Sequence, residues 1–365
     1  MQVPTSLYWR TQFMQRLKPL YKSFGDFESW LLKSELSEIT IKKPIYITAL
    51  ARSGTTIITE ILSQVEGVCS HTYGDFPATF TPYWKNWLRQ KKQFLKENKS
   101  ERAHQDRIFI NNNSPEAFEE VLWMYFYPEI HQNGVCDQLT ANSHPEFIDY
   151  YRQHIKKHLL VKNKSRYIAK ANYNINRIEM LLDIFPDAQF IIPIRHPVNH
   201  IASLTKQHKY YLEAASKNPK INKQLIASGH FEFGKHRQIV NFNDTTYAQT
   251  VLQCWNKKQE IAGWSHYWKG LYQQVYELKH RNEKFNRAIQ FIKFEDLCTH
   301  SEKTLTDIFQ QTRLNNTKAI ISKYKDRLSL PKYYQLSFNQ EEINTILDIT
   351  QTVSDIFGYN KNNFN

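Results

Sequence analysis

The loop Arg52-Ser53-Gly54-Thr55-Thr56 has the residue types of an anion-binding site. It follows a short apolar, β-rich run at residues 44–50 and precedes apolar residues at helical spacing: Ile57, Ile58, Ile61, Leu62 and Val65. This order predicts a strand, a tight loop and a helix. A glycine-containing turn at the start of a helix points successive backbone N–H groups at one place, where the helix N-terminus adds partial positive charge. We therefore expect the loop to bind an anion, with its three hydroxyl groups as further donors.

The same loop lacks the pattern of an ATP-binding loop, G-x-x-x-x-G-K-[ST]. Ala49 stands at the place of the first glycine, no lysine follows Gly54, and the nearby cation is Arg52. No motif in the sequence calls for a magnesium ion. A sulfuryl group carries less charge than a phosphoryl group, so hydrogen-bond donors and cations alone suffice to offset the charge that develops on its leaving oxygen.

A second candidate anion site follows the apolar run at residues 190–194. Arg195 comes directly after this predicted strand, and Ser203 lies eight residues later in a predicted helix. A guanidinium and a hydroxyl at this spacing can converge on one phosphate. Ligands of open α/β sheets bind outside the carboxyl ends of the strands, where both this pair and the first loop are expected. The alternative is that Arg195 caps a helix or pairs with Glu295 or Asp296.

Lys170 ends another predicted strand, Tyr167-Ile168-Ala169, and so faces the same edge of the sheet as the loop. An ammonium group beside the bridging oxygen of a leaving group would stabilise that group. The alternative is a surface lysine whose aliphatic stem covers apolar residues.

The elements that carry these residues alternate along the chain. Strands are predicted near residues 44–50, 167–169, 190–194 and 288–293, with helical patterns between them. Such alternation predicts an α/β fold, P-loop-like, with three αβα layers around a central, mostly parallel sheet. We expect a single domain over residues 1–365, in which helical insertions at 78–165 and 206–285 shape one side of a cleft.

Residues 1–40 are predicted to form a helical extension. Trp9, Phe13, Leu17 and Leu20 recur at helical spacing. Packing of these residues onto the core is favoured over attachment to a membrane surface, because the polar face of the helix is not exclusively basic.

The composition limits the class of protein. The formal net charge is +13, but the lysines and arginines are spread along the chain without a nucleic-acid-binding motif, so no specific nucleic-acid partner is predicted. No apolar run approaches the roughly 20 residues of a membrane span, and the N-terminus lacks the apolar core of a secretory signal. We therefore expect a cytoplasmic protein. The scattered cysteines argue against a disulfide scaffold and a structural zinc site: Cys69, Cys136, Cys254 and Cys298.

The chain resembles the PAPS-dependent sulfotransferases, in particular the tyrosylprotein and bacterial branch. The resemblance lies in three ordered segments, residues 49–62, 167–203 and 291–309. It implies that the Arg52–Thr56 loop binds the 5'-phosphosulfate of PAPS (3'-phosphoadenosine 5'-phosphosulfate) and that Arg195 and Ser203 bind its 3'-phosphate. It also implies that Lys170 contacts the transferring sulfuryl group.

A general base is needed in addition, because an acceptor hydroxyl loses its proton as the new S–O bond forms. In the tyrosylprotein branch this base is a glutamate about twenty residues past the loop arginine. The nearest carboxylate here is Asp75, a few positions away and one carbon shorter, and His71 is the neighbour most able to replace it. The alternative for Asp75 is an Asx-turn before Phe76-Pro77. Four other histidines are candidates for acceptor contact: His104, His196, His230 and His236.

These residues together predict a sulfotransferase that moves a sulfuryl group from PAPS to a hydroxyl or amine and releases adenosine 3',5'-bisphosphate (PAP). The acceptor stays open among small-molecule, carbohydrate, lipid and protein-tyrosine hydroxyls, as does the oligomeric state. No metal is expected, since no histidines or carboxylates were recognised at ligand spacing. The alternatives are a nucleotide-dependent kinase and a non-catalytic basic protein that binds nucleic acid or anionic lipid.

Overall fold

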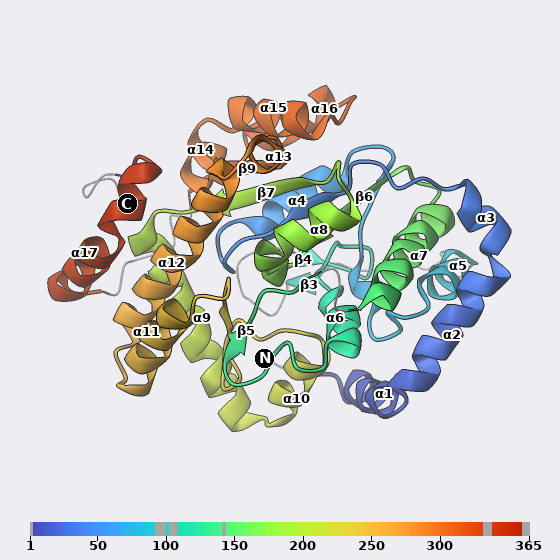
Figure 1. Cartoon of the computed structure of the whole chain (residues 1–365), viewed down its shortest axis with the longest axis horizontal. Helices are drawn as coiled ribbons and strands as arrows, with labels where there is room; N and C mark the ends of the chain where they lie inside the picture. Colours follow the sequence, from blue (N-terminus) through green and yellow to red (C-terminus); the bar gives the residue numbers. More distant parts are fainter. Residues whose placement is uncertain (1–2, 92–99, 102–108, 141–143, 331–337, 360–365) are drawn as a thin grey trace.

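A five-stranded parallel sheet forms the centre of the computed structural model, which describes residues 3–91, 100–101, 109–140, 144–330 and 338–359 (Figure 1). Its strands lie in the order β2-β6-β1-β7-β9, and each neighbouring pair is parallel. Their bounds are Val68–Cys69 for β2, Arg166–Lys170 for β6, Ile45–Ile47 for β1, Gln189–Ile194 for β7 and Ile289–Lys293 for β9. The order is not sequential, so helices cross over between neighbouring strands, as parallel pairing requires.

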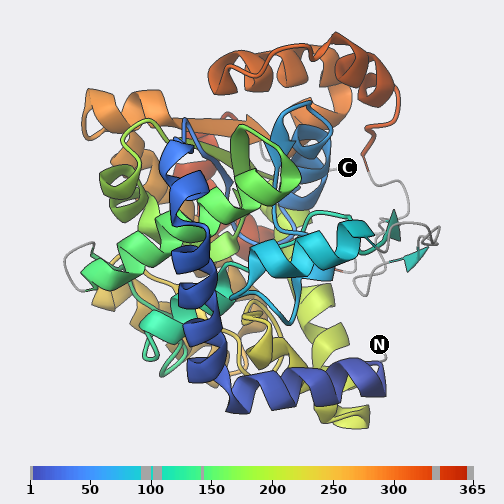
Figure 2. The same ribbon diagram turned by 90° about the vertical axis from the view of Figure 1, so that its right-hand side faces the viewer.

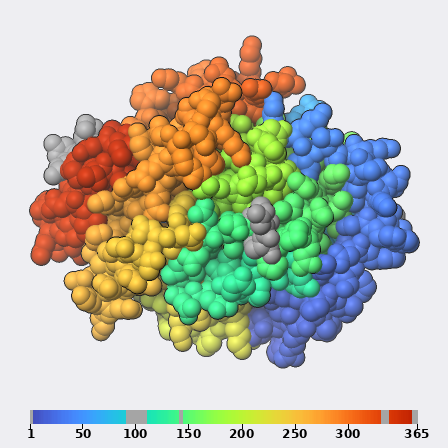
Figure 3. Space-filling model, in the orientation of Figure 1, coloured from blue at the N-terminus to red at the C-terminus, as the bar shows by residue number. Residues whose placement is uncertain are grey.

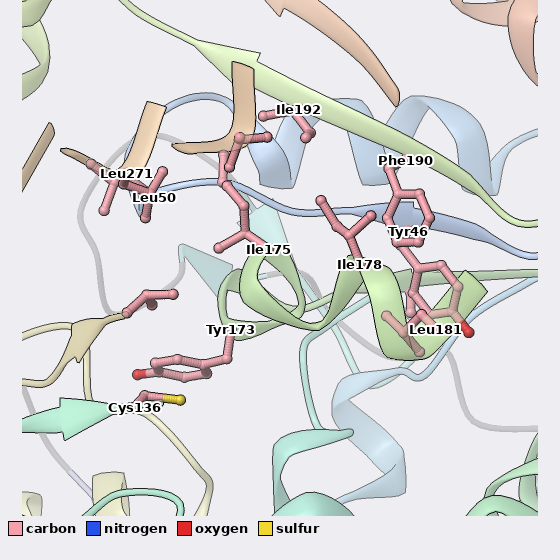
Figure 4. Packing of buried hydrophobic residues seen from close by; sticks show 14 of the residues in the cluster. Tyr46, Leu50, Cys136, Tyr173, Ile175, Ile178, Leu181, Phe190, Ile192 and Leu271 are labelled. Atoms are coloured by element: carbon pink, nitrogen blue, oxygen red, sulfur yellow. The ribbon is translucent and has the colours of Figure 1, made fainter. Parts of the chain in front are cut away.

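Helices cover both faces of this sheet because successive strand residues point to opposite faces. On one face Ile45, Ile47 and Ile191 pack in a cluster with four helices: α4 (Thr55–Ser63), α14 (Phe294–Thr299), α15 (Ser301–Thr312) and α16 (Lys318–Lys325). On the other face Tyr46 stacks on Phe190, with ring centroids 5.4 Å apart, above residues of α8 (Figure 4). Eight helices contribute to this second cluster: α6 (Glu120–Phe126), α7 (Pro145–Lys162), α8 (Ile178–Ile184), α9 (Pro197–Lys217), α11 (Thr245–Asn256), α12 (Glu260–His280), α13 (Glu283–Ala288) and α17 (Gln340–Ile356). The predicted three-layer αβα architecture is confirmed.

The two predicted insertions are largely helical and meet each other. The first contains α5 (Pro82–Lys91), α6 and α7, and the second contains α10 (Lys220–Ala227), α11 (Thr245–Asn256) and α12 and ends within α13 (Glu283–Ala288). Strand β5 (Val135–Cys136) of the first insertion pairs in parallel with β8 (Ile239–Val240) of the second. A two-stranded antiparallel ribbon, β3 (Ser100–Glu101) and β4 (Phe109–Ile110), belongs to the first. The boundaries of a single domain stay a prediction.

The N-terminal extension forms three helices, α1 (Thr5–Arg16), α2 (Lys18–Leu31) and α3 (Lys33–Glu38), along one edge of the molecule (Figures 2 and 3). The prediction that its recurring apolar residues pack on the core is wrong for three of them, since Trp9, Phe13 and Leu20 are 62%, 59% and 48% exposed. Helix α1 is turned so that its Thr11 hydroxyl accepts a hydrogen bond from Gln224 of α10 (3.3 Å). A polar contact with another helix thus fixes a rotation that the apolar spacing does not predict.

No helix of the described segments combines the length and apolarity needed to cross a bilayer.

Candidate active site

The loop between β1 and α4 has the backbone of an anion cradle. Gly54 has φ +107°, in the left-handed region that favours glycine, and α4 begins at the next residue. A Cβ at position 54 would lie 2.7 Å from Cδ2 of Phe294, so the space also requires glycine. Arg52 has φ +71°, an uncommon value for a residue with a side chain. Backbone outliers of this kind cluster at ligand sites, where the surrounding structure enforces them.

Two hydrogen bonds hold this loop and the residues before it in place. The Ser53 hydroxyl donates to the Leu50 carbonyl (2.8 Å), and Nε2 of His200 on α9 lies 2.8 Å from the Ala51 carbonyl. Burial lowers the pKa of His200 to about 3, so the ring is neutral near pH 7 and donates from Nε2. The Ser53 side chain therefore supports the loop, and its expected contact with the donor stays a prediction. The hydroxyls of Thr55 and Thr56 lie in the first turn of α4.

The predicted phosphate clamp lies beside this loop. Arg195 follows β7, and Ser203 projects from α9 so that its Oγ lies 3.3 Å from Nε of Arg52. The guanidinium of Arg195 lies 5.2 Å from the ring centroid of Phe294, the residue that also crowds Gly54. The structure thus brings Arg52, Arg195 and Ser203 together at the carboxyl edge of the sheet.

Glu295, one of the residues considered as a partner for Arg195, accepts two hydrogen bonds beside the turn after β7. One carboxylate oxygen accepts from the backbone N–H of His196 (2.9 Å), and the other accepts from the Tyr359 hydroxyl (2.9 Å). This carboxylate therefore fixes the turn that carries Arg195.

Lys170 forms an ion pair with a residue that the sequence analysis did not assign. Lys170 ends β6 opposite Ile47 of β1, directly before the loop, and its Nζ lies 2.7 Å from Oε1 of Glu116. Both side chains are less than 10% exposed. Glu116 also accepts a hydrogen bond from the Tyr73 hydroxyl, and its Oε1 accepts one from the Ala117 N–H (2.8 Å). A carboxylate and an ammonium are thereby held together where the loop begins.

Asp75 lies in a different environment. It is 1% exposed, and its Oδ2 accepts hydrogen bonds from the backbone N–H (2.7 Å) and the hydroxyl (3.2 Å) of Thr72. Its Oδ1 accepts from Asn86 (2.9 Å), and Nζ of Lys162 lies 3.6 Å from Oδ2. Burial alone would raise the pKa of Asp75, but the charge of Lys162 and these hydrogen bonds keep it below its usual value. The carboxylate closes a capping box around the short helix Tyr73–Asp75, which argues against its predicted role as general base.

His71, the predicted substitute for Asp75, is also enclosed. It is 2% exposed, and its ring stacks on His154 with the centroids 5.0 Å apart. Burial lowers the pKa of His71 to about 4, so the ring is neutral near pH 7. Its main chain nevertheless matters to the site, because the His71 carbonyl accepts a hydrogen bond from the backbone N–H of Glu116 (3.1 Å).

One of the other candidate histidines lies near the ion pair. His230 interacts electrostatically with Glu116 and Lys170, and its Nδ1 is 3.7 Å from Oε2 of Glu232. Burial alone would lower the pKa of His230, but Glu232 outweighs this effect and raises it above the usual value. His196 is buried, His236 is exposed, and His104 lies outside the described residues.

A cavity of about 460 Å³ opens on one side of these residues. Thr56 of the loop, Thr72 and Pro115 belong to its lining, together with the cationic side chains of Arg89 and Lys162. Thr72 and Pro115 are the chain neighbours of Tyr73 and Glu116.

A second cavity, of about 840 Å³, lies along α9. Ala202 and Thr205, on either side of Ser203, belong to its lining, as do Lys206, Lys209 and Lys258. The lining also contains Glu213, Glu260 and Glu342, so this cavity carries charges of both signs.

Comparison with known proteins identifies the family. A model described as "Sulfotransferase family" matches residues 44–227, half of the chain and the part that contains the loop, Lys170, Arg195 and Ser203. The chain belongs to the sulfotransferase family, as the sequence predicted. No curated protein sequence matches it.

A solved sulfotransferase structure shows the same fold. The sulfotransferase STF9 from Mycobacterium avium aligns with a TM-score of 0.52 at 11% sequence identity, over 91% of this chain and 82% of that one. The sulfotransferase STF1 from Mycobacterium tuberculosis H37Rv aligns with a TM-score of 0.48 at 12% identity, over 89% and 80% of the two chains.

Proposed function

We propose that this protein transfers a sulfuryl group from PAPS to a hydroxyl or amine, with Glu116 as general base and Lys170 as the cation at the leaving oxygen. The observation that supports this assignment is the Lys170–Glu116 ion pair, 2.7 Å long, at the sheet edge where the anion loop begins. Family membership supplies sulfuryl transfer in general; the donor, the residue roles and the direction of approach are our proposal.

The loop and clamp suit a donor with two anionic ends. The backbone of Gly54 and the first turn of α4 offer N–H groups to a phosphosulfate, and the left-handed Gly54 lets that group approach the main chain closely. Arg195 and Ser203 would hold the 3'-phosphate, with Arg52 between the two anions.

In the proposed reaction Glu116 accepts the proton of the acceptor hydroxyl while that oxygen forms a bond to sulfur. The bond between sulfur and the bridging oxygen breaks in the same in-line displacement, and its electron pair leaves on PAP. Lys170 and the loop N–H groups stabilise the charge that develops on this oxygen. The products are the sulfated acceptor and PAP, with the proton on Glu116 returned to solvent.

We prefer Glu116 to Asp75 as the general base because the two carboxylates contact different groups. Asp75 closes a capping box with Thr72 and accepts from Asn86, whereas Glu116, whose oxygens also accept hydrogen bonds, contacts the lysine that ends β6. Tyr73 and Lys170 orient the Glu116 carboxylate, which lets it accept a proton from a group that enters beside them.

The acceptor would enter through the 460 Å³ cavity, whose lining includes Thr72 and Pro115. Its polar and cationic walls favour an acceptor with several hydroxyl groups or an anionic group over a purely apolar one. Small-molecule, carbohydrate, lipid and tyrosine hydroxyls all remain in the acceptor class, and a cytoplasmic location stays a prediction.

The decisive experiment is a thermal shift with PAP, followed by a transfer assay. A ligand that binds only the folded state at 100 times its Kd stabilises it by about 2.7 kcal/mol. We expect PAP to raise the melting temperature by several degrees and ATP with magnesium to raise it much less. We also expect PAPS to yield PAP in the presence of a panel of phenol, sugar, lipid and tyrosyl-peptide acceptors. Preferential stabilisation by ATP would instead indicate a kinase, and a response to neither nucleotide would indicate a non-catalytic basic protein.

A further inference from the structure

Three buried histidines from distant parts of the chain meet behind the proposed base. His71 follows β2, and His154 and His158 lie four residues apart, on one face of α7. Nε2 of His71 lies 3.0 Å from Nε2 of His154, and the ring centroid of His158 is 4.3 Å from that of His71. One ligand atom from each of the three residues can be chosen so that all lie within 4.8 Å of one another. All three are at most 2% exposed.

The hydrogen bonding of this cluster is incomplete. Its three rings have six nitrogens, of which two meet in the His71–His154 contact. The other four, Nδ1 of His71, Nδ1 of His154 and both nitrogens of His158, have no hydrogen-bond partner among the described residues. Buried polar atoms are normally paired, so four unpaired nitrogens in one place call for an additional partner.

The rings are in the protonation state of metal ligands. Burial lowers the pKa of His71 to about 4, against the opposing charge of Asp75, and it lowers the pKa values of His154 and His158 well below the usual histidine value. Neutral imidazole is the form that binds a metal ion. The spacing also fits, because two nitrogens about 2.0–2.1 Å from a tetrahedral zinc ion lie roughly 3.3 Å apart.

We propose that His71, His154 and His158 bind one divalent transition-metal ion of the zinc type. Two histidines at i and i+4 on a helix with a third from elsewhere make a three-nitrogen set that zinc accepts, with a fourth position for water. Asp75 lies 3.9 Å from Nδ1 of His71, the ring nitrogen opposite the one that faces His154. A carboxylate in this place orients a ligating histidine through its second nitrogen.

The role of this metal would be structural. It would tie the segment after β2 to α7, and that segment holds Glu116 through the His71 carbonyl and the Tyr73 hydroxyl. Metal binding would therefore fix the position of Glu116 without taking part in the transfer. The proposal stands on the histidines alone and does not depend on PAPS being the donor.

The test uses the full chain without a histidine tag. After dialysis against a chelating resin, elemental analysis of protein reloaded with Zn²⁺ should find about one ion per chain, and Co²⁺ should give the visible absorption of a tetrahedral site. The variant His158→Phe keeps a planar ring, slightly larger and without ligand nitrogens, and should lose this stoichiometric binding. Asp75→Asn keeps all three ligands and should weaken zinc binding by about 10- to 100-fold.

His266→Gln, on the half-buried face of α12, is the matched control and should bind zinc as the parent does. Circular dichroism reports whether each variant is folded. If the parent chain binds neither Zn²⁺ nor Co²⁺ stoichiometrically, or if folded His158→Phe binds them as tightly as the parent, the cluster is a neutral histidine network and the proposal is wrong. The wild-type measurements decide the question even if His158→Phe does not fold.

Discussion

Nζ of Lys170 and Oε1 of Glu116 lie 2.7 Å apart although 54 residues separate them in the chain. The lysine comes from the end of a central strand, and the glutamate from the first helical insertion. The pairing keeps a carboxylate and an ammonium at the sheet edge where the anion loop begins. In the proposed reaction the lysine orients the base before transfer and stabilises the leaving oxygen during it.

Replacing Glu116 with glutamine removes the proposed base and keeps the side-chain shape. We expect the rate of sulfuryl transfer from PAPS to fall by about 10²- to 10⁴-fold, the usual contribution of general base catalysis, with PAP affinity nearly unchanged. Steady-state kinetics and calorimetric titration with PAP measure the two effects.

Asp75→Asn is the matched comparison for Glu116→Gln. It should reduce the transfer rate by less than about tenfold, because its effect on the base is indirect. If Asp75→Asn abolished transfer and Glu116→Gln did not, the base would be Asp75, as the sequence alone suggested.

Removing the guanidinium of Arg195 should weaken PAP binding. Charge-assisted hydrogen bonds contribute about 1.5–3 kcal/mol, so Arg195→Ala should raise the Kd for PAP by about 10- to 150-fold. Ser203→Ala should have a smaller effect, about 0.5–1.5 kcal/mol. Isothermal titration calorimetry gives both values.

Arg287→Ala is the control for Arg195→Ala, since Arg287 is 78% exposed and pairs only with its helical neighbour Glu283 among the contacts observed. Its Kd should equal that of the parent. Equal PAP affinity in Arg195→Ala and the parent would remove Arg195 from the donor site.

Gly54→Ala tests two reasons why the loop needs glycine: the left-handed backbone conformation and the close approach of Phe294. A left-handed conformation costs a residue with a side chain about 1–2 kcal/mol, and the added Cβ would also lie 2.7 Å from Phe294. We expect a loss of stability in urea unfolding together with weaker PAP binding.

Gly358→Ala separates the two reasons. Gly358 also has a positive φ (+66°), but its added Cβ would have Lys293 no closer than 3.5 Å. This variant should lose stability without affecting PAP binding. A Gly54→Ala protein as stable as the parent and equal in PAP affinity would contradict the close fit of the loop against Phe294.

The buried carboxylate of Glu120 predicts a pH dependence of stability. It accepts hydrogen bonds from both terminal nitrogens of Arg177, each 2.7 Å long, and Nε2 of His131 lies 2.6 Å away. Burial alone would raise the pKa of Glu120, but the charge and hydrogen bonds of Arg177 outweigh it and lower the pKa from 4.5 to about 2. Since the folded pKa lies below the unfolded one, this stabilisation is present above about pH 4.5 and is lost as the pH falls towards 2.

Glu120→Gln should therefore be less stable at pH 7, by about 3–5 kcal/mol for a broken buried ion pair. Its urea unfolding free energy should also fall less than that of the parent between pH 4.5 and 2, the window set by the two pKa values. Glu283→Gln, at a side chain 63% exposed, is the control and should follow the parent. Parallel curves for Glu120→Gln and the parent would contradict the lowered pKa.

Features encoded locally were predictable from the sequence. The Arg52–Thr56 loop, Lys170 and Arg195 each follow a buried apolar run, and parallel strands bring their carboxyl ends to one edge. Strand β2 was missed because it has only two residues, too few for a periodic pattern.

Features that depend on distant contacts were not predictable in the same way. Nothing near Glu116 in the sequence indicates that it meets Lys170, and the rotation of α1 depends on polar contacts with α10. One signal was present but overlooked, since His154 and His158 have the i, i+4 spacing of helical metal ligands. Their third partner, His71, is 83 residues from His154 and becomes visible only in the fold.

The contact between Arg52 and Ser203, 3.3 Å from Nε to Oγ, affects the free energy with which a nucleotide can bind. A long side chain that samples many rotamers in the free protein loses conformational entropy when it binds a ligand, and that loss weakens binding. Here the hydrogen bond between the Arg52 guanidinium and the Ser203 hydroxyl already limits the rotamers of both side chains, at the site where we expect the donor to bind. An arriving PAPS molecule would exchange one weak internal bond for stronger ones to its own oxygens, and little of its binding energy would go into ordering the protein.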